Sequence, residues 1–377
     1  MNILEIRKLF PHIEKGIIYF NHASASPLSF RVQEEIKNYI HNQSVYRIDD
    51  IIAMIKESSK AKELFASLIN STPERIAYTD NTSNGLNILA QGIKWKRGDR
   101  VLLNDIEFPA NVYPFLNLKK KGVIIDFVKS EDKVVDAESI IENIKPRTKL
   151  ISVSQVQFLS GYRIDLRKIG KVCKERDIIF CVDAAQGLGA VRLDVKEDNI
   201  DFISCGSQKW LMGLQGFGFI YVSEELQQNM EPAFVGWLSN KSPSKNLLDY
   251  KINLRKTADC FENGTISLVG AFALSASLSL FSDFGFDNVE KKILDNTSYF
   301  IFKLKDNGID TYQSKVKRKF HSGIVSFTHK DPTRIHYELQ KENIRFSVRE
   351  GIVRFSPHFY NSLDEINEVV YYLNQVI

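Results

Sequence analysis

Short apolar runs rich in β-branched and aromatic residues recur along the first two thirds of the chain, separated by segments with a helical spacing of apolar positions. In one such segment, 166–176, the apolar residues Ile169, Val172 and Cys173 share one helix face. The runs predicted to be strands are 76–79, 101–104, 124–128, 150–154, 178–183, 202–205 and 217–222. This alternation predicts an α/β fold in three layers, αβα, with a mostly parallel seven-stranded sheet.

A different pattern follows in the last third of the chain. A long helix rich in small residues is predicted over 267–281, and it leads into a unit of mixed helices and strands. The elements predicted there are a helix over 287–306, strands near 323–328, 344–349 and 352–356, and a final amphipathic helix over 362–375. We therefore expect a large domain, 16–265, and a smaller α+β domain, 266–377, which the N-terminal segment 1–15 joins.

Composition and charge narrow the class of protein. The 377 residues are 44% hydrophobic, enough for a large core divided between two domains. The net charge is only +4 and the basic runs are short, so we expect no nucleic-acid partner. Residues 1–15 carry charges throughout, and no apolar stretch is long enough to cross a bilayer, so we expect a cytoplasmic protein without a membrane partner. The four cysteines include no CxxC pair, so no metal is expected.

The strongest chemical signal is a lysine that follows a predicted buried strand. Lys209 comes after the run 202–205, and a loop broken by Gly213 and Gly216 comes directly after it. Burial of an ammonium lowers its pKa and prepares the amine to add to a carbonyl. A lone strand-end lysine more often simply extends its head into water.

An aspartate ends the preceding predicted strand. Asp183 closes the run 178–183 and so lies at the carboxyl edge of a parallel sheet, where open α/β folds bind ligands. By itself Asp183 could equally cap a helix or form a turn. Together with Lys209 it forms the pair that pyridoxal phosphate requires. The lysine holds this cofactor as a Schiff base, and the aspartate keeps the pyridine nitrogen protonated.

Four segments resemble the class V aminotransferase family of fold type I pyridoxal-phosphate enzymes, which includes cysteine desulfurases, kynureninases and isopenicillin N epimerase-like proteins. They are 182–186, 208–218, 261–265 and 353–361, and they occur in the family's order. The resemblance extends from Ile17 to the C-terminus. It implies the fold of pyridoxal-phosphate-dependent transferases and a Schiff base between the cofactor and the lysine.

The resemblance also implies how the cofactor phosphate is held. Thr82 and Ser83 are expected at the N-cap of the helix that follows the run 76–79, where free amides and the helix dipole favour a dianion. Gln208 matches a phosphate-facing residue that precedes the Schiff-base lysine in relatives.

Two further residues are expected at the phosphate. Some relatives carry a serine at the position of Gly206, and Ser207 is expected to compensate for its loss here. Thr265 matches a residue that, in relatives, reaches the phosphate of the neighbouring subunit. The resemblance therefore implies a homodimer with a shared active site.

The ring of the cofactor is expected between aromatic and amide side chains. Phe108 matches the residue that covers the ring, for which desulfurases usually have histidine; phenylalanine can stack but cannot carry a proton. Gln186 matches a residue near the phenolic oxygen. Gln155 and Phe158 stand where desulfurases have His and Asn, so these positions depart from the desulfurase pattern.

Substrate binding requires a cation for the carboxylate of an amino acid. Arg354 matches the carboxylate-binding arginine of the family, and its guanidinium can fork onto a carboxylate in two parallel bonds. Arg349 lies close by and could serve instead or as well. His22 lies on the N-terminal segment that in relatives closes over the substrate, and it is a weaker candidate. A surface salt bridge is the structural alternative for Arg354.

These residues predict an aminotransferase acting on an amino acid or related amine. A lyase or an epimerase of the same family is the alternative, because the same groups serve all three reactions. The segment 347–354 contains no cysteine where desulfurases carry their nucleophile, so standard desulfurase activity is not expected. A nicotinamide-binding enzyme is disfavoured because no G-x-G-x-x-G opens a helix, and a catalytically silent binding protein because the polar groups are present.

Overall fold

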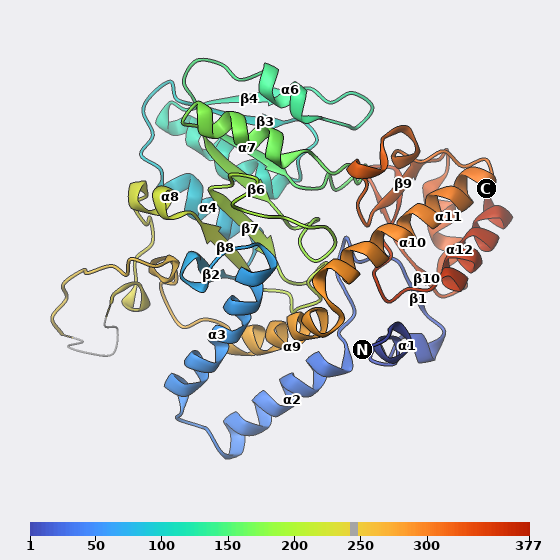
Figure 1. Cartoon of the computed structure of the whole chain (residues 1–377), viewed down its shortest axis with the longest axis horizontal. Coiled ribbons are helices and arrows are strands. Elements are labelled where there is room, and N and C mark those ends of the chain that lie inside the picture. The colour runs from blue at the N-terminus through green and yellow to red at the C-terminus, as the bar shows by residue number, and fades with distance from the viewer. Residues whose placement is uncertain (242–247) are drawn as a thin grey trace.

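A seven-stranded sheet forms the centre of the computed structural model, which describes residues 1–241 and 248–377. The strand order is β2-β8-β7-β6-β5-β3-β4 (Figure 1). The strands are β2 (Ile76–Thr79), β3 (Arg100–Asn104), β4 (Ile124–Val128), β5 (Thr148–Ser154), β6 (Ile179–Asp183), β7 (Phe202–Gly206) and β8 (Gly218–Val222). β8 is antiparallel to both of its neighbours, and the other pairs are parallel. The predicted mostly parallel sheet is confirmed.

Helices connect the strands and extend below the sheet. Those before residue 265 are α1 (Ile3–Arg7), α2 (Phe30–Val45), α3 (Ile51–Leu68), α4 (Thr82–Gly92), α5 (Tyr113–Leu116), α6 (Ala137–Glu142), α7 (Leu166–Glu175) and α8 (Glu224–Asn229). Short 3-10 helices are η1 (Ile13–Lys15), η2 (Pro73–Arg75), η3 (Pro109–Asn111), η4 (Asn117–Lys121), η5 (Trp237–Ser239), η6 (Ala258–Phe261), η7 (Gln313–Lys315) and η8 (Arg318–Phe320). The elements expected from the sequence do not include the long helices α2 and α3.

The sheet divides the apolar core into two layers. Successive strand residues point to opposite faces, so Leu102 of β3 belongs to one buried cluster and its neighbours Val101 and Leu103 to the other. α7 adds Ile169 to the first cluster, whereas α4 adds Leu89 to the second. Helices therefore cover both faces of the sheet, as the predicted three-layer arrangement requires.

The remaining elements follow β8 and α8. They are α9 (Leu268–Phe284), α10 (Phe286–Asp306), β9 (Val325–Thr328), α11 (Pro332–Lys341), β10 (Ile344–Arg345), β11 (Ser347–Arg349), β12 (Ile352–Phe355) and α12 (Leu363–Val376). β11, β12 and β9 form an antiparallel sheet. The single strand expected near 344–349 is two strands, because β10 pairs with β1 (Ile18–Tyr19) while β11 pairs with β12.

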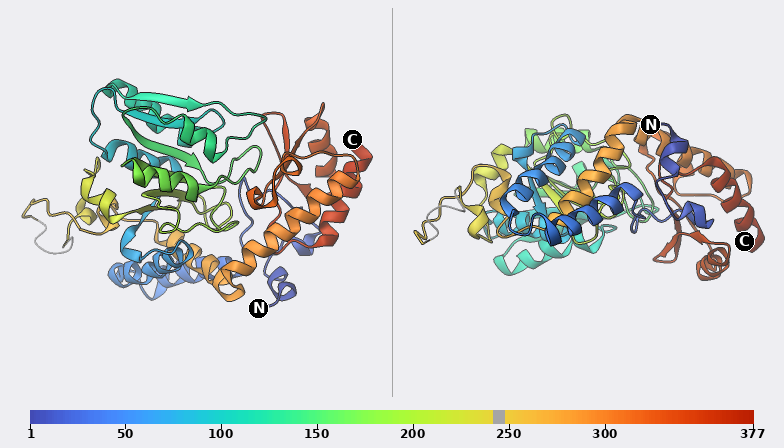
Figure 2. Two further views of the ribbon diagram at one scale, coloured as in Figure 1. Left: turned by 45° about the horizontal axis from the view of Figure 1, so that its top comes forward. Right: turned by 90° about the horizontal axis from the view of Figure 1, so that it is seen from below.

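The N-terminal segment lies against the C-terminal elements, as Figure 2 shows from two further directions. α9 comes just before these C-terminal elements in the sequence, and it packs instead against α2 and α3. The proposed domain boundary at residue 265 stays a prediction. Among the described helices, no single one is long and apolar enough to cross a membrane; α9 and α10 pass that test only as a pair bent by 82°.

Candidate active site

The ends of two parallel strands bring Asp183 and the segment before Lys209 together. β6 and β7 are parallel neighbours, with Asp183 opposite Ser204, so both strands end at the carboxyl edge of the sheet. A cavity of about 160 Å³ lies there. Its lining residues are Asn81, Thr82, Ser83, Phe108, Ala110, Ser154, Phe158, Asp183, Ala185, Gln186, Gln208 and Lys209. A larger cleft of about 1190 Å³ lies between α2, α3 and α9, but helix side chains line it rather than strand ends.

The Lys209 ammonium lies in surroundings that favour its neutral amine. Burial lowers the pKa of Lys209, and the positive charges of Arg354 and Arg349 lower it further, against the attraction of Asp183. The Lys209 Nζ lies 5.6 Å from the centre of the Phe108 ring. A neutral amine at this position can act as a nucleophile or as a base.

Asp183 is the carboxylate that faces this lysine. It is 5% exposed, and its Oδ1 accepts a hydrogen bond of 2.9 Å from the amide of Ala185. Burial raises the pKa of Asp183 to about 6, although the Ala185 amide and the Lys209 charge act in the opposite direction. Among the described residues, none donates a side-chain or loop hydrogen bond to the second Asp183 oxygen, so this buried carboxylate is suited to pair with a cationic ring nitrogen.

The amino end of α4 opens into the same cavity. Its N-cap is Asn81, whose side chain accepts from the amide of Asn84, so Thr82 and Ser83 are the first two helical residues rather than the cap. The expectation that Thr82 or Ser83 is the N-cap was therefore wrong, by one position for Thr82 and by two for Ser83. Their amides and the helix dipole would still favour an anion bound at this end, and both residues line the cavity.

The three other phosphate candidates differ in their placement. Gln208 lines the cavity, whereas the Ser207 hydroxyl donates to the Leu214 carbonyl at 2.7 Å and the side chain is fully buried. Ser207 and Gln208 lie in the turn that follows β7, and of these two only Gln208 lines the cavity. Thr265 lies outside the cavity, in a cleft of about 450 Å³ beside Glu262 and Ser267.

Of the side chains expected around the cofactor ring, some line the cavity and others do not. Phe108, 47% exposed, presents a free face to the cavity and packs edge-to-face against Phe158 at 5.3 Å between ring centres. Gln186 also lines the cavity, and its amide donates to the Ala23 carbonyl at 2.9 Å. The exposed face of Phe108 is available for a planar ring.

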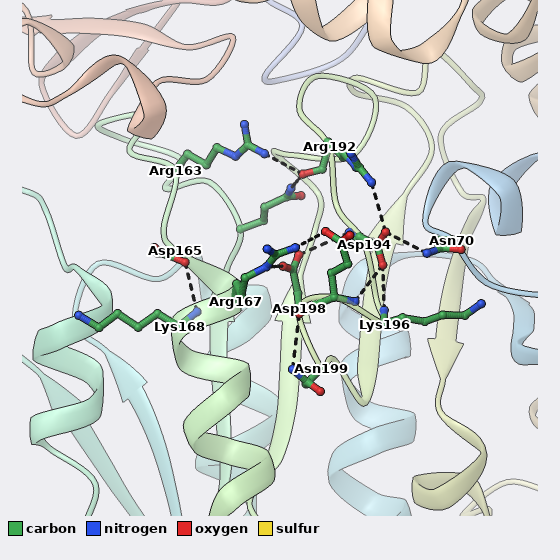
Figure 3. A network of polar contacts seen from close by, with 12 residues as sticks. Asn70, Arg163, Asp165, Arg167, Lys168, Arg192, Asp194, Lys196, Asp198 and Asn199 are labelled. Carbon is green, nitrogen blue, oxygen red and sulfur yellow. Dashed lines mark hydrogen bonds and ion pairs between the residues drawn. The ribbon is translucent and has the colours of Figure 1, made fainter.

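Gln155 is the exception among these candidates. Its amide donates to the Arg192 carbonyl at 2.9 Å, so it joins the polar network shown in Figure 3, where Arg163 donates to the same carbonyl. The neighbouring Ser154 lines the cavity instead. The structure therefore does not bring the Gln155 side chain to the cavity.

The carboxylate-binding candidate Arg354 is a buried cation. It is 2% exposed and donates to the Phe158 carbonyl at 2.8 Å, the Ser24 hydroxyl at 3.0 Å and the Ser347 hydroxyl at 3.2 Å. Burial lowers the pKa of Arg354 to about 9, and the charge of Arg349 adds to this effect. No acidic side chain forms an ion pair with Arg354 within residues 1–241 and 248–377, so a surface salt bridge does not explain it.

The other two substrate candidates lie on either side of Arg354. Arg349 is exposed, and its guanidinium lies 3.4 Å from the Ser24 hydroxyl. His22 is fully buried, and its ring nitrogens are bonded to the Ser356 carbonyl and to the Tyr360 hydroxyl. Burial lowers the pKa of His22 well below its ordinary value. The structure therefore does not support a substrate contact for His22.

Sequence reasoning missed two groups that shape the site. Glu107 is a buried acceptor for Asn104, Asn111 and Ser154, so it fixes the loop that carries Phe108. On the N-terminal segment, Ser26 donates to the Lys209 carbonyl at 2.5 Å. The signal for Glu107 was an acid directly before the stacking residue, and the signal for Ser26 was the run of small residues over 23–26.

These features together fit pyridoxal phosphate. The cavity offers an amine for its aldehyde, a buried carboxylate for its pyridine nitrogen, an aromatic face at Phe108 and a helix amino end for its phosphate. All four cysteines are buried, and none of them lines the cavity.

A family model and two curated relatives agree with this interpretation. The family model described as aminotransferase class-V matches residues 18–369. A probable cysteine desulfurase of Pyrococcus abyssi is 29% identical over 99% of this chain and 97% of its own length. An uncharacterized aminotransferase of Bacillus subtilis, YcbU, is 24% identical over 97% of this chain and 96% of its own length.

Solved structures show the same fold. The apo cysteine desulfurase from Thermococcus onnurineus NA1 has a TM-score of 0.89 and 26% identity, and the match covers 100% of this chain and 98% of that one. A mutant of the enzyme C-DES with glycine covalently linked to its PLP cofactor has a TM-score of 0.89 and 23% identity, with 98% and 99% covered. The fold of pyridoxal-phosphate-dependent transferases that the resemblance implied is confirmed.

Proposed function

Because the chain belongs to the aminotransferase class-V family and is a pyridoxal-phosphate-dependent enzyme, we propose that it is an aminotransferase acting on an amino acid or a related amine. One observation carries this proposal. A lysine with a lowered pKa faces a buried aspartate across a small cavity, and a buried arginine without a carboxylate partner lies beside it.

Each of these residues has a distinct task in the proposed reaction. When bound, pyridoxal phosphate supplies an aldehyde that condenses with amines and a ring that accepts the electron pair left on the substrate α-carbon. Arg354 binds the substrate carboxylate with its forked guanidinium and so fixes the orientation of the Cα–H bond. Asp183 would hold a proton at the ring nitrogen, and Lys209 would remove the proton from the substrate α-carbon and carry it to the aldehyde-derived carbon of the cofactor, as transamination requires.

Lys209 is well placed to be the base. The residues that line the cavity include two titratable side chains, Lys209 and Asp183, and the carboxylate would be occupied by the ring nitrogen of the cofactor. Phe108 stands where a histidine would offer a second proton carrier, and phenylalanine has no transferable proton. Proton transfer is therefore assigned to the lysine alone.

Persulfide-forming desulfuration is not supported by the thiols of this chain. It requires a mobile, ionised cysteine near the substrate. Cys173, Cys181, Cys205 and Cys260 are buried, and burial raises the pKa of each thiol, that of Cys260 to about 11. An epimerase or lyase reaction would use the same lysine, aspartate and arginine. In epimerisation Lys209 would return the proton to the α-carbon, whereas in a lyase reaction a substituent would leave from the β-carbon.

The test begins with the purified holoenzyme. We expect a yellow protein, and borohydride should fix a pyridoxyl adduct on Lys209, located by peptide mass spectrometry. Half-reactions with a panel of amino acids, followed by absorbance, should form an oxo acid from the substrate. Colour and adduct that persist in Lys209→Ala would refute the assignment of the lysine. Racemised substrate without oxo acid, or release of a β-substituent, would replace transamination by epimerisation or elimination.

A homodimer with a shared site is also proposed. Thr265 lies outside the cavity of its own chain, in the cleft beside Glu262, so a contact with the phosphate would have to come from a second copy. This placement supports the expectation from the family, and mixed dimers test it below.

A further inference from the structure

Two guanidinium groups converge on one hydroxyl beside the proposed substrate position. Arg354 donates to the Ser24 Oγ at 3.0 Å, and Arg349 approaches the same oxygen at 3.4 Å. A hydroxyl oxygen that faces two cations cannot neutralise either of them. Ser24 therefore holds the two arginines near each other without supplying a counter-charge.

The β11–β12 hairpin explains why both arginines face the same way. Arg354 pairs with Ser347, and Arg349 is two residues from Ser347, so the alternation of side chains places both arginines on one face. The turn residues Glu350 and Gly351 have φ values of 49° and 76°, which match a two-residue type I′ turn. The turn fixes the register of the hairpin, so the hairpin itself holds the two arginines on the same face.

The charges around this face do not balance. The positive charges of Arg354 and Arg349 both lower the pKa of Lys209, whereas the negative charge of Asp183 raises it. In the described part of the chain, neither Arg349 nor Arg354 has a carboxylate within ion-pair distance. A buried cation without a partner is costly, so this arrangement indicates that a ligand supplies the missing negative charge. This cost applies to the buried Arg354, whereas the exposed Arg349 is hydrated and is accessible to a second anionic group.

We propose that Arg349, Ser24 and Arg354 form a subsite for two anionic groups, so that the preferred substrate is an amino acid with a second carboxylate on its side chain. Arg354 binds the α-carboxylate, Arg349 binds the side-chain carboxylate, and Ser24 spaces the two guanidinium groups. This inference rests on the proposed function, because it assigns the substrate class of the same site.

The alternative occupant is a single carboxylate held by both arginines. Both guanidinium groups reach the same oxygen of Ser24, so they could also grip one carboxylate together. The two arrangements differ in what the loss of Arg349 does. A second-carboxylate site loses affinity for acidic side chains selectively, whereas a shared clamp loses affinity for every amino acid by the same factor.

The experiment measures dissociation constants of the holoenzyme by absorbance titration, which requires binding but no turnover. Glutamate is compared with glutamine and aspartate with asparagine, because each pair differs in charge and hardly in shape. We expect the wild type to prefer each acid by about tenfold or more, the size of a partly exposed charge pair. In Arg349→Gln the acid-to-amide ratio should fall to about one, and Arg349→Lys should keep part of it.

Arg334→Gln provides the matched control, because Arg334 is exposed on α11 and loses the same charge. It should leave the acid-to-amide ratio at the wild-type value. A wild type that binds amides as well as acids would overturn the inference, and so would an Arg349→Gln variant that weakens both members of a pair equally. Selective binding of acids by an enzyme that forms no oxo acid would instead refute the aminotransferase proposal and leave the subsite standing.

Discussion

Replacing Arg354 should make the apoprotein more stable while it removes most of the activity. Arg354 is 2% exposed and has no acidic partner among the described residues. A cation in that position favours ligand binding and disfavours folding, so the two effects of Arg354→Gln are expected to have opposite signs. Glutamine retains an uncharged donor for the Phe158 carbonyl.

The expected size of the stability gain follows from the pKa of Arg354. A value lowered to about 9 means that folding disfavours the charged guanidinium by on the order of 5 kcal/mol. Glutamine keeps one of the three hydrogen bonds to Ser24, Ser347 and Phe158 and loses two, which at about 1.5–2 kcal/mol each cost about 3–4 kcal/mol together. The net gain in the free energy of unfolding should therefore be about 1–2 kcal/mol near neutral pH.

The gain should depend on pH in one direction. Below about pH 9 Arg354 is charged in both the folded and the unfolded chain, so the wild type carries the full destabilisation there. As pH rises through that value, the folded guanidinium loses its proton and the wild type recovers stability. The difference between Arg354→Gln and the wild type should therefore shrink above pH 9.

The expected loss of activity comes from the substrate carboxylate. Two charge-assisted hydrogen bonds to a carboxylate contribute on the order of 3–4 kcal/mol together, so kcat/KM should fall by about 10²–10³. Urea unfolding of the apoprotein and oxo-acid formation by the holoenzyme measure the two effects, with Arg334→Gln as the control. A variant that unfolds more easily than the wild type, or that keeps kcat/KM within about threefold, would refute the reasoning.

Three further predictions concern other parts of the structure. Gly85→Ala places a Cβ against the Ser204 side chain, so it should destabilise the protein by about 1–3 kcal/mol in urea unfolding, and Ser204→Gly should restore part of the loss. Burial lowers the pKa of His358 to about 3, so wild-type stability should fall as pH drops below about 6.5, and His358→Asn should reduce that slope by up to about 1.4 kcal/mol per pH unit. If the site is shared, mixing inactive Lys209→Ala and weakened Thr265→Ala chains should recover activity in mixed dimers, whereas no recovery would speak for a site complete within one chain.

The strands of the central sheet could be predicted from the sequence because burial gives them a plain hydrophobic pattern. Strands such as β5, β7 and β8 are buried on both faces, so each appears as a short apolar run in the sequence, whereas the edge strand β4 is partly exposed. Lys209 and Asp183 could be paired because parallel neighbours end at the same edge of a sheet. Those two inferences require no knowledge of long-range contacts.

The side-chain directions at the cavity could not be predicted in the same way. Ser154 and Gln155 are adjacent polar residues at one strand end, and only the twist of the chain decides which of them faces the cavity. Asn81, Thr82 and Ser83 are all good N-cap residues, so the true cap could not be selected from residue type. The role of Ser24 depends on its contact with Arg354, which tertiary structure alone creates.

The pairing of β1 with β10 has a consequence for how the enzyme matures. Ile18 pairs with Ile344, and most of the polypeptide lies between them. β1 therefore cannot form this pair until synthesis of the chain is nearly complete. The central sheet can assemble earlier, while the chain is still on the ribosome. Within one chain we therefore expect the segment that bonds to the Lys209 carbonyl to be added last, so that only the dimer contact proposed for Thr265 would follow it in the completion of the catalytic centre.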